Sequence, residues 1–347
     1  MKNKVLILLL SLLGVVSCHR EEAPASGSLR IVFETEAFQT KSGVIDPVED
    51  GSAIYVSEGV PDLVILIANN STGNIVATYP DGPDGPMING ALEGTPTSTK
   101  SSVSFSGLTG NLTYTVYAFA NTQGLWTIKS GESTVSSLLT LTTQTQVEAL
   151  QFEPIPADKD ACGCLAIKNG RMPLSAQGET TLTALGNGEI SLALKRCVAK
   201  VTAVFENQYG ENLTLTSFSN TFYHMNPGTS YVVPHANDFP VEQEDANDGN
   251  ITATQASLSI ADNGTYSTSW YVFPSIGPYT CDVIFTMDAL EHRYINLPVH
   301  DDHARDITQL ARNQHLTITT RIGKGKQVSF NFEVQDWGEK TERVTFN

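Results

Sequence analysis

The sequence lacks the features on which catalysis and nucleic-acid binding depend. It contains no Gly-x-Ser-x-Gly, no His-Glu-x-x-His and no phosphate-cradling glycine loop, which excludes the enzyme classes built on those motifs. Basic residues are few, with Lys+Arg 21 against Asp+Glu 37 and a formal net charge of -16. A phosphate backbone would repel such a chain, so we expect no nucleic-acid partner. We therefore predict a protein that is not an enzyme and that needs no cofactor.

Long apolar segments are also missing, apart from one at the N-terminus. Val5 to Val16 follows two lysines, is too short to span a bilayer, and has the layout of a secretory signal. The run ends in Val15-Val16-Ser17-Cys18, which looks like a bacterial lipobox. We predict that the signal peptide is cut before Cys18, that this cysteine is acylated (palmitate), and that the lipid anchors the protein in the outer membrane. A plain secretory signal with an incidental cysteine is the alternative.

Four cysteines remain after Cys18, namely Cys162, Cys164, Cys197 and Cys281. An oxidising compartment permits disulfides, but the sequence does not choose among the pairings that four cysteines allow. The spacing of Cys162 and Cys164 is too close for a zinc knuckle and lacks the two intervening residues of a thioredoxin motif. Cys197 and Cys281 fall at apolar positions of predicted strands, where a buried thiol and a bridge are equally compatible with the pattern.

The remainder of the chain has the pattern of an all-β protein. Segments that alternate apolar and polar residues recur every ten or so residues, with Gly, Asn and Pro between them, which is typical of antiparallel β-sandwiches. Leu63 to Ala68 is apolar on both faces and suits a central strand. Ser133 to Leu141 could form a short helix. The predicted strands are Leu29–Glu34, Leu63–Ala68, Ser101–Phe105, Leu112–Ala120, Ile190–Phe205, Leu213–Phe218, Tyr231–Pro234, Ile251–Ile260, Ser269–Phe273, Cys281–Met287, Tyr294–Val299, Leu316–Ile322 and Val328–Gln335.

The length of 347 residues suits about two domains. Gly186-Asn187-Gly188 is a compact turn signal near the middle of the chain, and we place the domain boundary there. The predicted organisation is a signal peptide over residues 1–17, a tether over 18–27, an N-terminal sandwich over 28–187, and a C-terminal sandwich over 188–347.

The C-terminal segment has the clearest strand pattern of all. Val328, Phe330, Phe332 and Val334 alternate strictly with polar residues, so a strand here would bury one face. A second short alternation, which contains Val344 and Phe346, runs to the end of the chain. A terminal strand must be paired, because its backbone otherwise forms a free edge. Its partner is either the same molecule or the next one.

The best cluster of metal-capable side chains lies in a short polar segment. Neighbouring residues of an extended chain point to opposite faces, so few of these side chains could bind one ion, and we predict no metal site. The cluster comprises His300, Asp301, Asp302, His303 and Asp306.

Several short motifs follow one another along the chain in a specific order. They are the lipobox, the basic Lys41 after the first strand, Tyr117–Thr122, Lys195–Val201, Ala311–Ile318 and the terminal Val334–Trp337. In this order and spacing they resemble the fimbrillins of Bacteroidales, the lipoprotein pilins of type V pili. The resemblance covers nearly the whole chain, although Lys41 stands where many relatives carry arginine.

This resemblance implies two transthyretin-like β-sandwich (Greek-key) domains and assembly by strand exchange. In such pilins a trypsin-like protease cuts after the basic residue that follows the first strand, and the strand leaves. A terminal strand of a neighbouring subunit then fills the groove. Carried over to this chain, the cut falls after Lys41, the departing strand is Leu29–Glu34, and the donor is Val328–Phe346. Arg30 is the poorer candidate for the cut, because it lies within the strand.

The implied function is a structural subunit of a cell-surface fimbrium that supports adhesion. Its implied partners are other fimbrial subunits, the maturation protease, and the outer membrane that holds the lipid before polymerisation. The alternative is a surface lipoprotein or tip adhesin that binds glycan or protein without polymerising. Whether the subunit belongs to shaft, tip or anchor is left open by the sequence.

Overall fold

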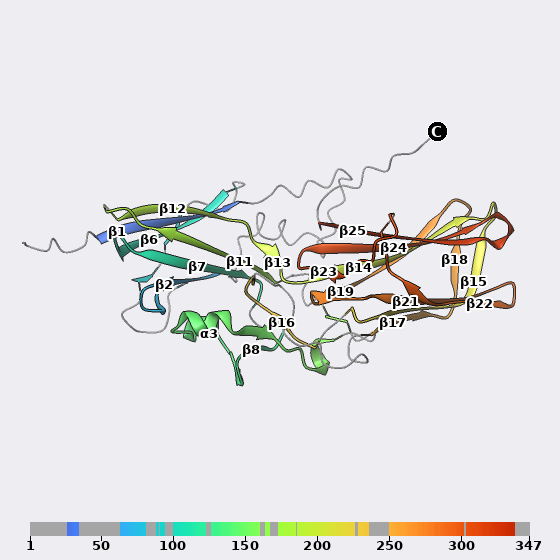
Figure 1. Cartoon of the computed structure of the whole chain (residues 1–347), viewed down its shortest axis with the longest axis horizontal. Coiled ribbons are helices and arrows are strands. Elements are labelled where there is room, and N and C mark those ends of the chain that lie inside the picture. The colour runs from blue at the N-terminus through green and yellow to red at the C-terminus, as the bar shows by residue number, and fades with distance from the viewer. Residues whose placement is uncertain are drawn as a thin grey trace, which may run out of the picture.

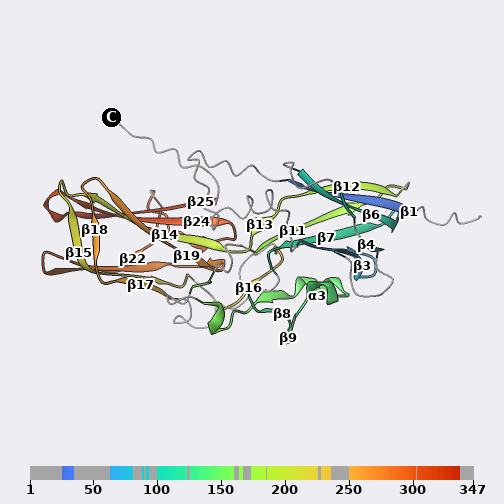
Figure 2. The ribbon, with the colours of Figure 1, turned by 180° about the vertical axis from the view of Figure 1, so that it is seen from behind.

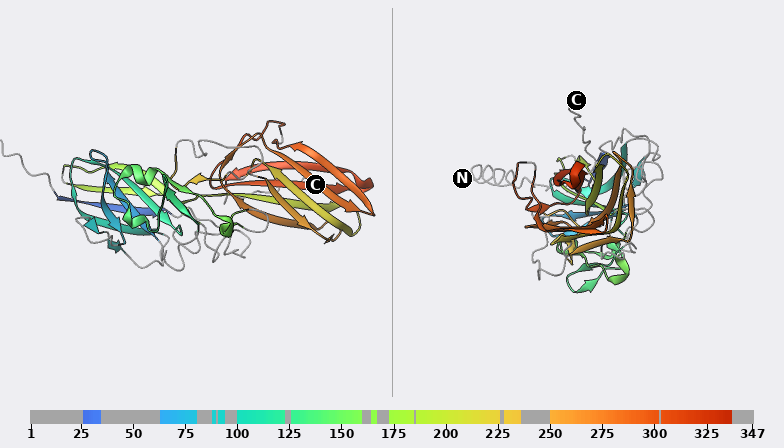
Figure 3. Two further views of the ribbon diagram at one scale, coloured as in Figure 1. Left: turned by 90° about the horizontal axis from the view of Figure 1, so that it is seen from below. Right: turned by 90° about the vertical axis from the view of Figure 1, so that its right-hand side faces the viewer.

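The computed structural model describes residues 26–34, 63–80, 88–89, 91–93, 100–122, 126–159, 164–166, 173–184, 186–225, 228–235, 250–301 and 303–336. These residues form an elongated molecule of two β-rich lobes placed end to end (Figures 1 and 3). The predicted all-β fold with two β-sandwich domains is confirmed.

The N-terminal lobe is a sandwich of two sheets. The first sheet has the order β12 (Asn187–Leu192), β1 (Ser26–Glu34), β6 (Lys100–Thr109) and β5 (Ala91–Glu93). The second has the order β13 (Lys195–Arg196), β11 (Leu174–Thr181), β7 (Thr113–Ala120), β2 (Val64–Asn69), β3 (Asn74–Tyr79) and β4 (Ile88–Asn89). Most pairs are antiparallel, but β1 runs parallel to β12 and β3 runs parallel to β4.

The predicted central strand at Leu63–Ala68 is β2, and each of its faces packs into a different core. Ile65 and Ile67 pack toward β1 in the core between the two sheets. Leu66 and Ala68 point the other way, into a second core under the sandwich. This double burial explains why the strand carries no alternation, since neither face meets water.

The second core is covered by a small layer that the sequence did not reveal. Its sheet has the order β16 (Ser230–Tyr231), β10 (Leu150–Phe152), β8 (Ile128–Ser130) and β9 (Ser133–Thr134). Three short helices accompany it, η1 (Leu138–Thr140), α3 (Gln144–Glu148) and η2 (Pro156–Asp158). The predicted helix at 133–141 is therefore mostly wrong, because the capping box of Thr143 and Gln146 starts the α-helix further along the chain.

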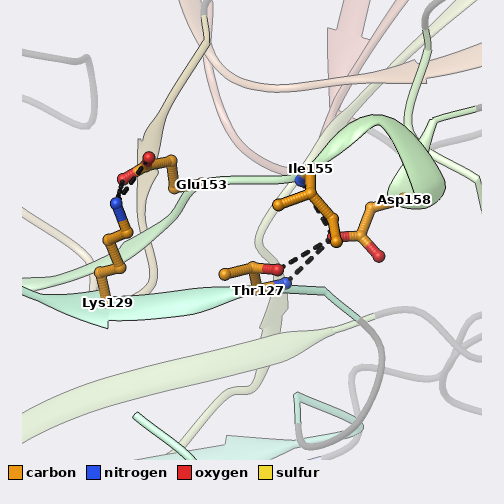
Figure 4. A network of polar contacts seen from close by, with 5 residues as sticks. All are labelled: Thr127, Lys129, Glu153, Ile155 and Asp158. Carbon is orange, nitrogen blue, oxygen red and sulfur yellow. Dashed lines mark hydrogen bonds and ion pairs between the residues drawn. The ribbon is translucent and has the colours of Figure 1, made fainter. Parts of the chain in front are cut away.

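Polar contacts fix this layer internally (Figure 4). The carboxylate of the buried Asp158 accepts the backbone N–H and the hydroxyl of Thr127 at 3.3 and 3.2 Å, and the N–H of Ile155 at 3.1 Å. These contacts join η2 to the start of β8. Lys129 of β8 forms an ion pair at 2.6 Å with Glu153, which directly follows β10.

The C-terminal lobe repeats the sandwich plan. One sheet has the order β19 (Thr265–Val272), β14 (Ala199–Gln208), β24 (Gln314–Gly323) and β25 (Val328–Asp336), with β14 parallel to β24. The other has the order β17 (Ile251–Gln255), β15 (Leu213–Tyr223), β21 (Thr280–Met287) and β22 (Leu290–Pro298), with β18 (Leu258–Ile260) also paired to β15. Two further strands, β20 (Ser275–Ile276) and β23 (Gln309–Leu310), pair with each other, and η3 (Lys324–Lys326) precedes β25.

The predicted boundary after Asn187 needs correction. It falls inside β12, whose residues up to Leu192 pair with β1, and Leu192 packs in the N-terminal core. The long alternating run from Ile190 to Phe205 is also not one strand. It divides into β12, β13 and β14, because the first part completes the N-terminal lobe and the last part opens the C-terminal lobe.

The described cysteines are all buried. Cys281 is a free thiol in the C-terminal core, where burial, and then the nearby Asp282 charge, raise its pKa to about 12. Cys164 packs in the same core, and Cys197 packs in the second core of the N-terminal lobe. Cys162 lies outside the described residues. None of the helices in the described part of the chain is long and apolar enough to cross a membrane.

Candidate strand-exchange site

The first described strand, β1, is a central strand of its sheet. It pairs antiparallel with β6 from Ser26 to Glu34 and parallel with β12 from Ser28 to Phe33. Both of its backbone edges are therefore used (Figure 2). If β1 left, the sheet would be split into two parts with a slot between them.

The inner face of β1 is apolar and closed off from water. Leu29, Ile31 and Phe33 are 0–1% exposed and pack in the core between the two N-terminal sheets. The predicted strand Leu29–Glu34 thus lies within β1, which starts three residues earlier. Residues 26 and 27 of the predicted tether belong to this strand.

The outer face of β1 carries Arg30, which contacts both neighbouring strands. Its guanidinium pairs with the Glu189 carboxylate of β12 at 2.9 Å and donates to the Ser102 hydroxyl of β6 at 3.2 Å. Arg30 lies in the middle of a strand paired on both sides, which is a poor setting for proteolysis because a protease must bind an extended, unpaired segment.

Within the described residues, β12 has no sheet neighbour other than β1. Loss of β1 would therefore leave β6 with an open edge and β12 with no pairing at all. A replacing strand would have to satisfy both. Sequence reasoning missed this role of β12, although the alternation of Ile190 and Leu192 after the Gly186-Asn187-Gly188 turn was a usable signal.

The last described strand, β25, is an edge strand. It pairs antiparallel with β24 over its whole length, from Val328 opposite Ile322 to Asp336 opposite Gln314. It pairs with no other strand among the described residues. In this structure the described part of the predicted donor, Val328 to Asp336, is held by its own chain.

The alternating face of β25 packs on the C-terminal core, as its pattern predicts. Phe332 is 4% exposed, and Val328, Phe330 and Val334 are half-buried against the same core. Phe330 lies edge-on to Tyr294 of β22, with ring centroids 5.1 Å apart. Burial raises the pKa of Tyr294 above its ordinary value.

The remaining predicted site residues lie outside the described part of the chain. These are Cys18, Lys41, Val344 and Phe346. The structure thus places the predicted departing strand between β6 and β12, and the described part of the predicted donor on the C-terminal lobe.

The described residues of the predicted polar cluster lie in a turn, and Asp302 lies outside the described residues. The Asp301 carboxylate pairs with the Arg305 guanidinium and accepts the backbone N–H groups of Arg305 and His303 at 2.9 Å, and these contacts hold its pKa well below the ordinary range, at about 2. Among the described residues, no three His, Cys, Asp or Glu side chains form a group that could hold a metal ion.

A comparison with known protein families shows to which family this chain of two β-sandwich lobes belongs. The family model of the fimbrillin-A associated anchor proteins Mfa1 and Mfa2 matches residues 95–343, which contain β6 to β25. The chain belongs to this family. The resemblance to Bacteroidales fimbrillins is thereby confirmed, and the protein is a fimbrial protein of the cell surface.

Solved structures resemble this chain at low sequence identity. A candidate cell adhesion protein of Bacteroides eggerthii DSM 20697 is 11% identical, with 90% of this chain and 97% of that chain covered and a TM-score of 0.52. The fimbrial anchor protein Mfa2 from Porphyromonas gingivalis is 9% identical, with 90% and 98% covered and a TM-score of 0.36. The first likeness shows a shared fold. No curated protein sequence matches the chain.

Proposed function

We propose that this chain is a fimbrial subunit, exported as a lipoprotein, that is joined to its neighbours by strand exchange. In this proposal β1 is the strand that leaves, after a trypsin-like cut behind Lys41, and the C-terminal segment is the strand that is donated. The observation that carries the proposal is the position of β1. It is a strand near the N-terminus, paired on both edges, and its removal alone would open a continuous apolar groove.

The energetics favour refilling such a groove. Leu29, Ile31 and Phe33 are fully buried, and each such side chain contributes about 1.5–3 kcal/mol by its burial. An empty groove would also expose the unpaired backbone of β6 and β12, a strong template for strand addition. Breaking the finished joint requires a whole strand to dissociate, so the polymer should be kinetically stable and resist detergent.

The order of Cys18, β1 and Lys41 along the chain couples loss of the lipid to loss of β1. Cys18 precedes β1, and Lys41 follows it, so one cut behind Lys41 would release the acylated cysteine and β1 together. A subunit that keeps its lipid therefore also keeps β1. Such a subunit has no open groove and can only donate.

This coupling defines a second candidate, which the description of the family as anchor proteins favours. In the second candidate the chain is not cut, remains acylated in the outer membrane, and ends the fimbrium by donating its C-terminal segment. Both candidates use strand exchange, with other fimbrial subunits as partners. They differ in the N-terminus of the assembled protein.

N-terminal analysis of assembled fimbriae separates the candidates. A start at Ser42 supports the cut subunit, and an acylated Cys18 supports the uncut anchor. Lys41→Ala should then prevent assembly in the first case, whereas Lys41→Arg, which keeps a trypsin-like site, should not. Deletion of Arg343–Asn347 should weaken assembly in both cases. If the Lys41→Ala and deletion variants both form the detergent-resistant ladder of the wild type on unboiled gels, strand exchange is the wrong mechanism.

A further inference from the structure

Segments from distant parts of the chain meet between the two lobes. The chain leaves the C-terminal lobe after β15 and runs through residues 228–235 beneath the N-terminal lobe, where β16 pairs with β10 (Figures 1 and 2). There the N–H of Val232 donates to the carbonyl of Leu150 at 3.0 Å. We call residues 228–235 the crossing segment. In the sequence it lies between strands of the C-terminal lobe, but its strand β16 pairs with β10 of the N-terminal lobe.

Arg312, two residues before β24, reaches from the C-terminal lobe into this region. One guanidinium nitrogen donates to the Ser175 hydroxyl of β11 at 2.9 Å and to the Val232 carbonyl at 3.4 Å. A second guanidinium nitrogen donates to the carbonyls of Tyr231 and Val233, both at 3.2 Å. Arg312 is only 6% exposed. We call Arg312, Ser175 and the three carbonyls the Arg312 clamp.

The clamp connects three parts of the molecule. Ser175 belongs to the N-terminal lobe, and its hydroxyl donates to the Val232 carbonyl at 2.6 Å, which fixes the crossing segment directly on β11. Arg312 belongs to the C-terminal lobe, and its neighbour Asn313 accepts from Arg196 of β13 at 3.0 Å. The guanidinium therefore joins both lobes through the same short segment.

An aromatic layer lies in the core beside the clamp. Trp126 and Phe152 come from the N-terminal part of the chain, and Phe273 follows β19 of the C-terminal lobe. Trp126 lies 5.3 Å from Phe152 and 6.0 Å from Phe273 between ring centroids, and Phe152 stacks on Phe273 at 5.9 Å. All three share one core with Val232 and Val233 of the crossing segment. Separating the lobes would break this core open.

We propose that the Arg312 clamp joins the two lobes into one rigid body that unfolds in one cooperative step. Domains of a chain normally move relative to each other unless their interface is large and apolar. Here the interface has an apolar core, and a planar guanidinium with five donors holds three successive carbonyls in one geometry. A lysine, as a single ammonium on a flexible stem, cannot span them in this way. The inference does not depend on strand exchange.

Two variants and a matched control test the proposal on the full chain. Arg312→Met removes every donor of the clamp but keeps most of the apolar stem, and Arg312→Lys keeps the charge. The control is Arg321→Met, in β24 itself, whose guanidinium pairs with Glu206 at 2.7 Å on the sheet surface. Each protein is studied by scanning calorimetry and by small-angle X-ray scattering.

The wild type and Arg321→Met should unfold in one transition and share one scattering profile. Arg312→Met should unfold in two transitions and show a larger radius of gyration, and Arg312→Lys should lie between. If Arg312→Met does not fold, Ser175→Ala, which removes one partner, should broaden the transition in the same direction. Two separate transitions in the wild type would overturn the proposal. So would a single transition and an unchanged profile in Arg312→Met or, should that variant fail to fold, in both Arg312→Lys and Ser175→Ala.

Discussion

β1 and β25, the first and last strands that the structure describes, are held in opposite ways. β1 has a neighbour on each side and a fully buried inner face, whereas β25 has one neighbour and, apart from Phe332, only half-buried apolar side chains. Removing β1 would split a sheet, and removing β25 would only move the edge of a sheet from β25 to β24. The two ends of the chain thus differ in what their departure costs before any partner arrives.

This asymmetry suits the two roles in the proposed assembly. An acceptor groove must be closed tightly until it is opened by cleavage, because an open groove would bind any strand. A donor must be released without unfolding its own lobe. The structure meets both conditions, since the C-terminal core between its two sheets would keep most of its residues if β25 left.

The largest expected effect on assembly comes from a disulfide that holds β1 in its sheet. Ser28 and Ser106 are exposed register partners on β1 and β6, so Ser28→Cys/Ser106→Cys should form a cross-strand disulfide. We expect the oxidised protein to stay monomeric after protease treatment and to assemble once the bond is reduced. Unboiled gels measure this.

The corresponding disulfide for β25 is made by Thr319→Cys/Asn331→Cys, which links β25 to β24. If the donor includes β25, this bond also blocks assembly; if the donor is confined to the residues beyond Asp336, it does not. An unchanged ladder for the β1 bond under oxidising conditions would contradict departure of β1 and favour the uncut anchor.

Truncating a buried aromatic ring in each strand should give unequal losses of stability. Phe33 of β1 is 1% exposed, and Phe33→Ala should cost about 3–5 kcal/mol through lost transfer energy and the cavity. Phe330 of β25 is half-buried, and Phe330→Ala should cost about 1–2 kcal/mol. Urea unfolding followed by circular dichroism measures both. Equal losses would mean that β25 is held as firmly as β1.

The sequence predicts an element of the fold well when the pattern that buries it is local, and poorly when its contacts come from distant parts of the chain. The strands β1, β21 and β25 were predictable because apolar and polar residues alternate along them, and β2 was predictable because its short run is apolar on both faces. The division of Ile190–Phe205 between two lobes was not, because both halves alternate in the same way. The Arg312 clamp was not predictable either, since three of its four acceptors are backbone carbonyls, which any residue type can supply.

The sheet that carries β25 should also respond to pH. His315 of β24 lies between Lys200 and Gln335 in register, and its ring nitrogen is 2.8 Å from the Thr202 hydroxyl. Burial, and then the Lys200 charge, lower its pKa to about 4. The unfolded chain binds this proton near pH 6.5 and the folded chain does not.

The folded state should therefore lose stability as the pH falls from about 6.5 to 4, by at most about 1.4 kcal/mol per pH unit from this one group. His315→Gln should flatten that part of the curve. Chemical unfolding at about pH 7.5, 6, 5 and 4.5 measures this loss of stability. A curve that is the same in both proteins would show that His315 titrates normally.

The smallest expected effect concerns Arg30, which contacts both neighbours of β1. Its ion pair with Glu189 is exposed on both sides, at 47% and 58%, and such pairs contribute about 0.2–1 kcal/mol. A double-mutant cycle with Arg30→Met and Glu189→Gln should give a coupling energy in this range, and the coupling should vanish near 1 M salt, where the Debye length is about 3 Å.

The pair Arg321–Glu206 between β24 and β14 is the control, because Glu206 is only 17% exposed and its coupling should be larger and less sensitive to salt. A strong, salt-resistant coupling at Arg30 would mean that the outer face also holds β1 to β12. In that case release of β1 would require more than the loss of its backbone pairing and its apolar contacts.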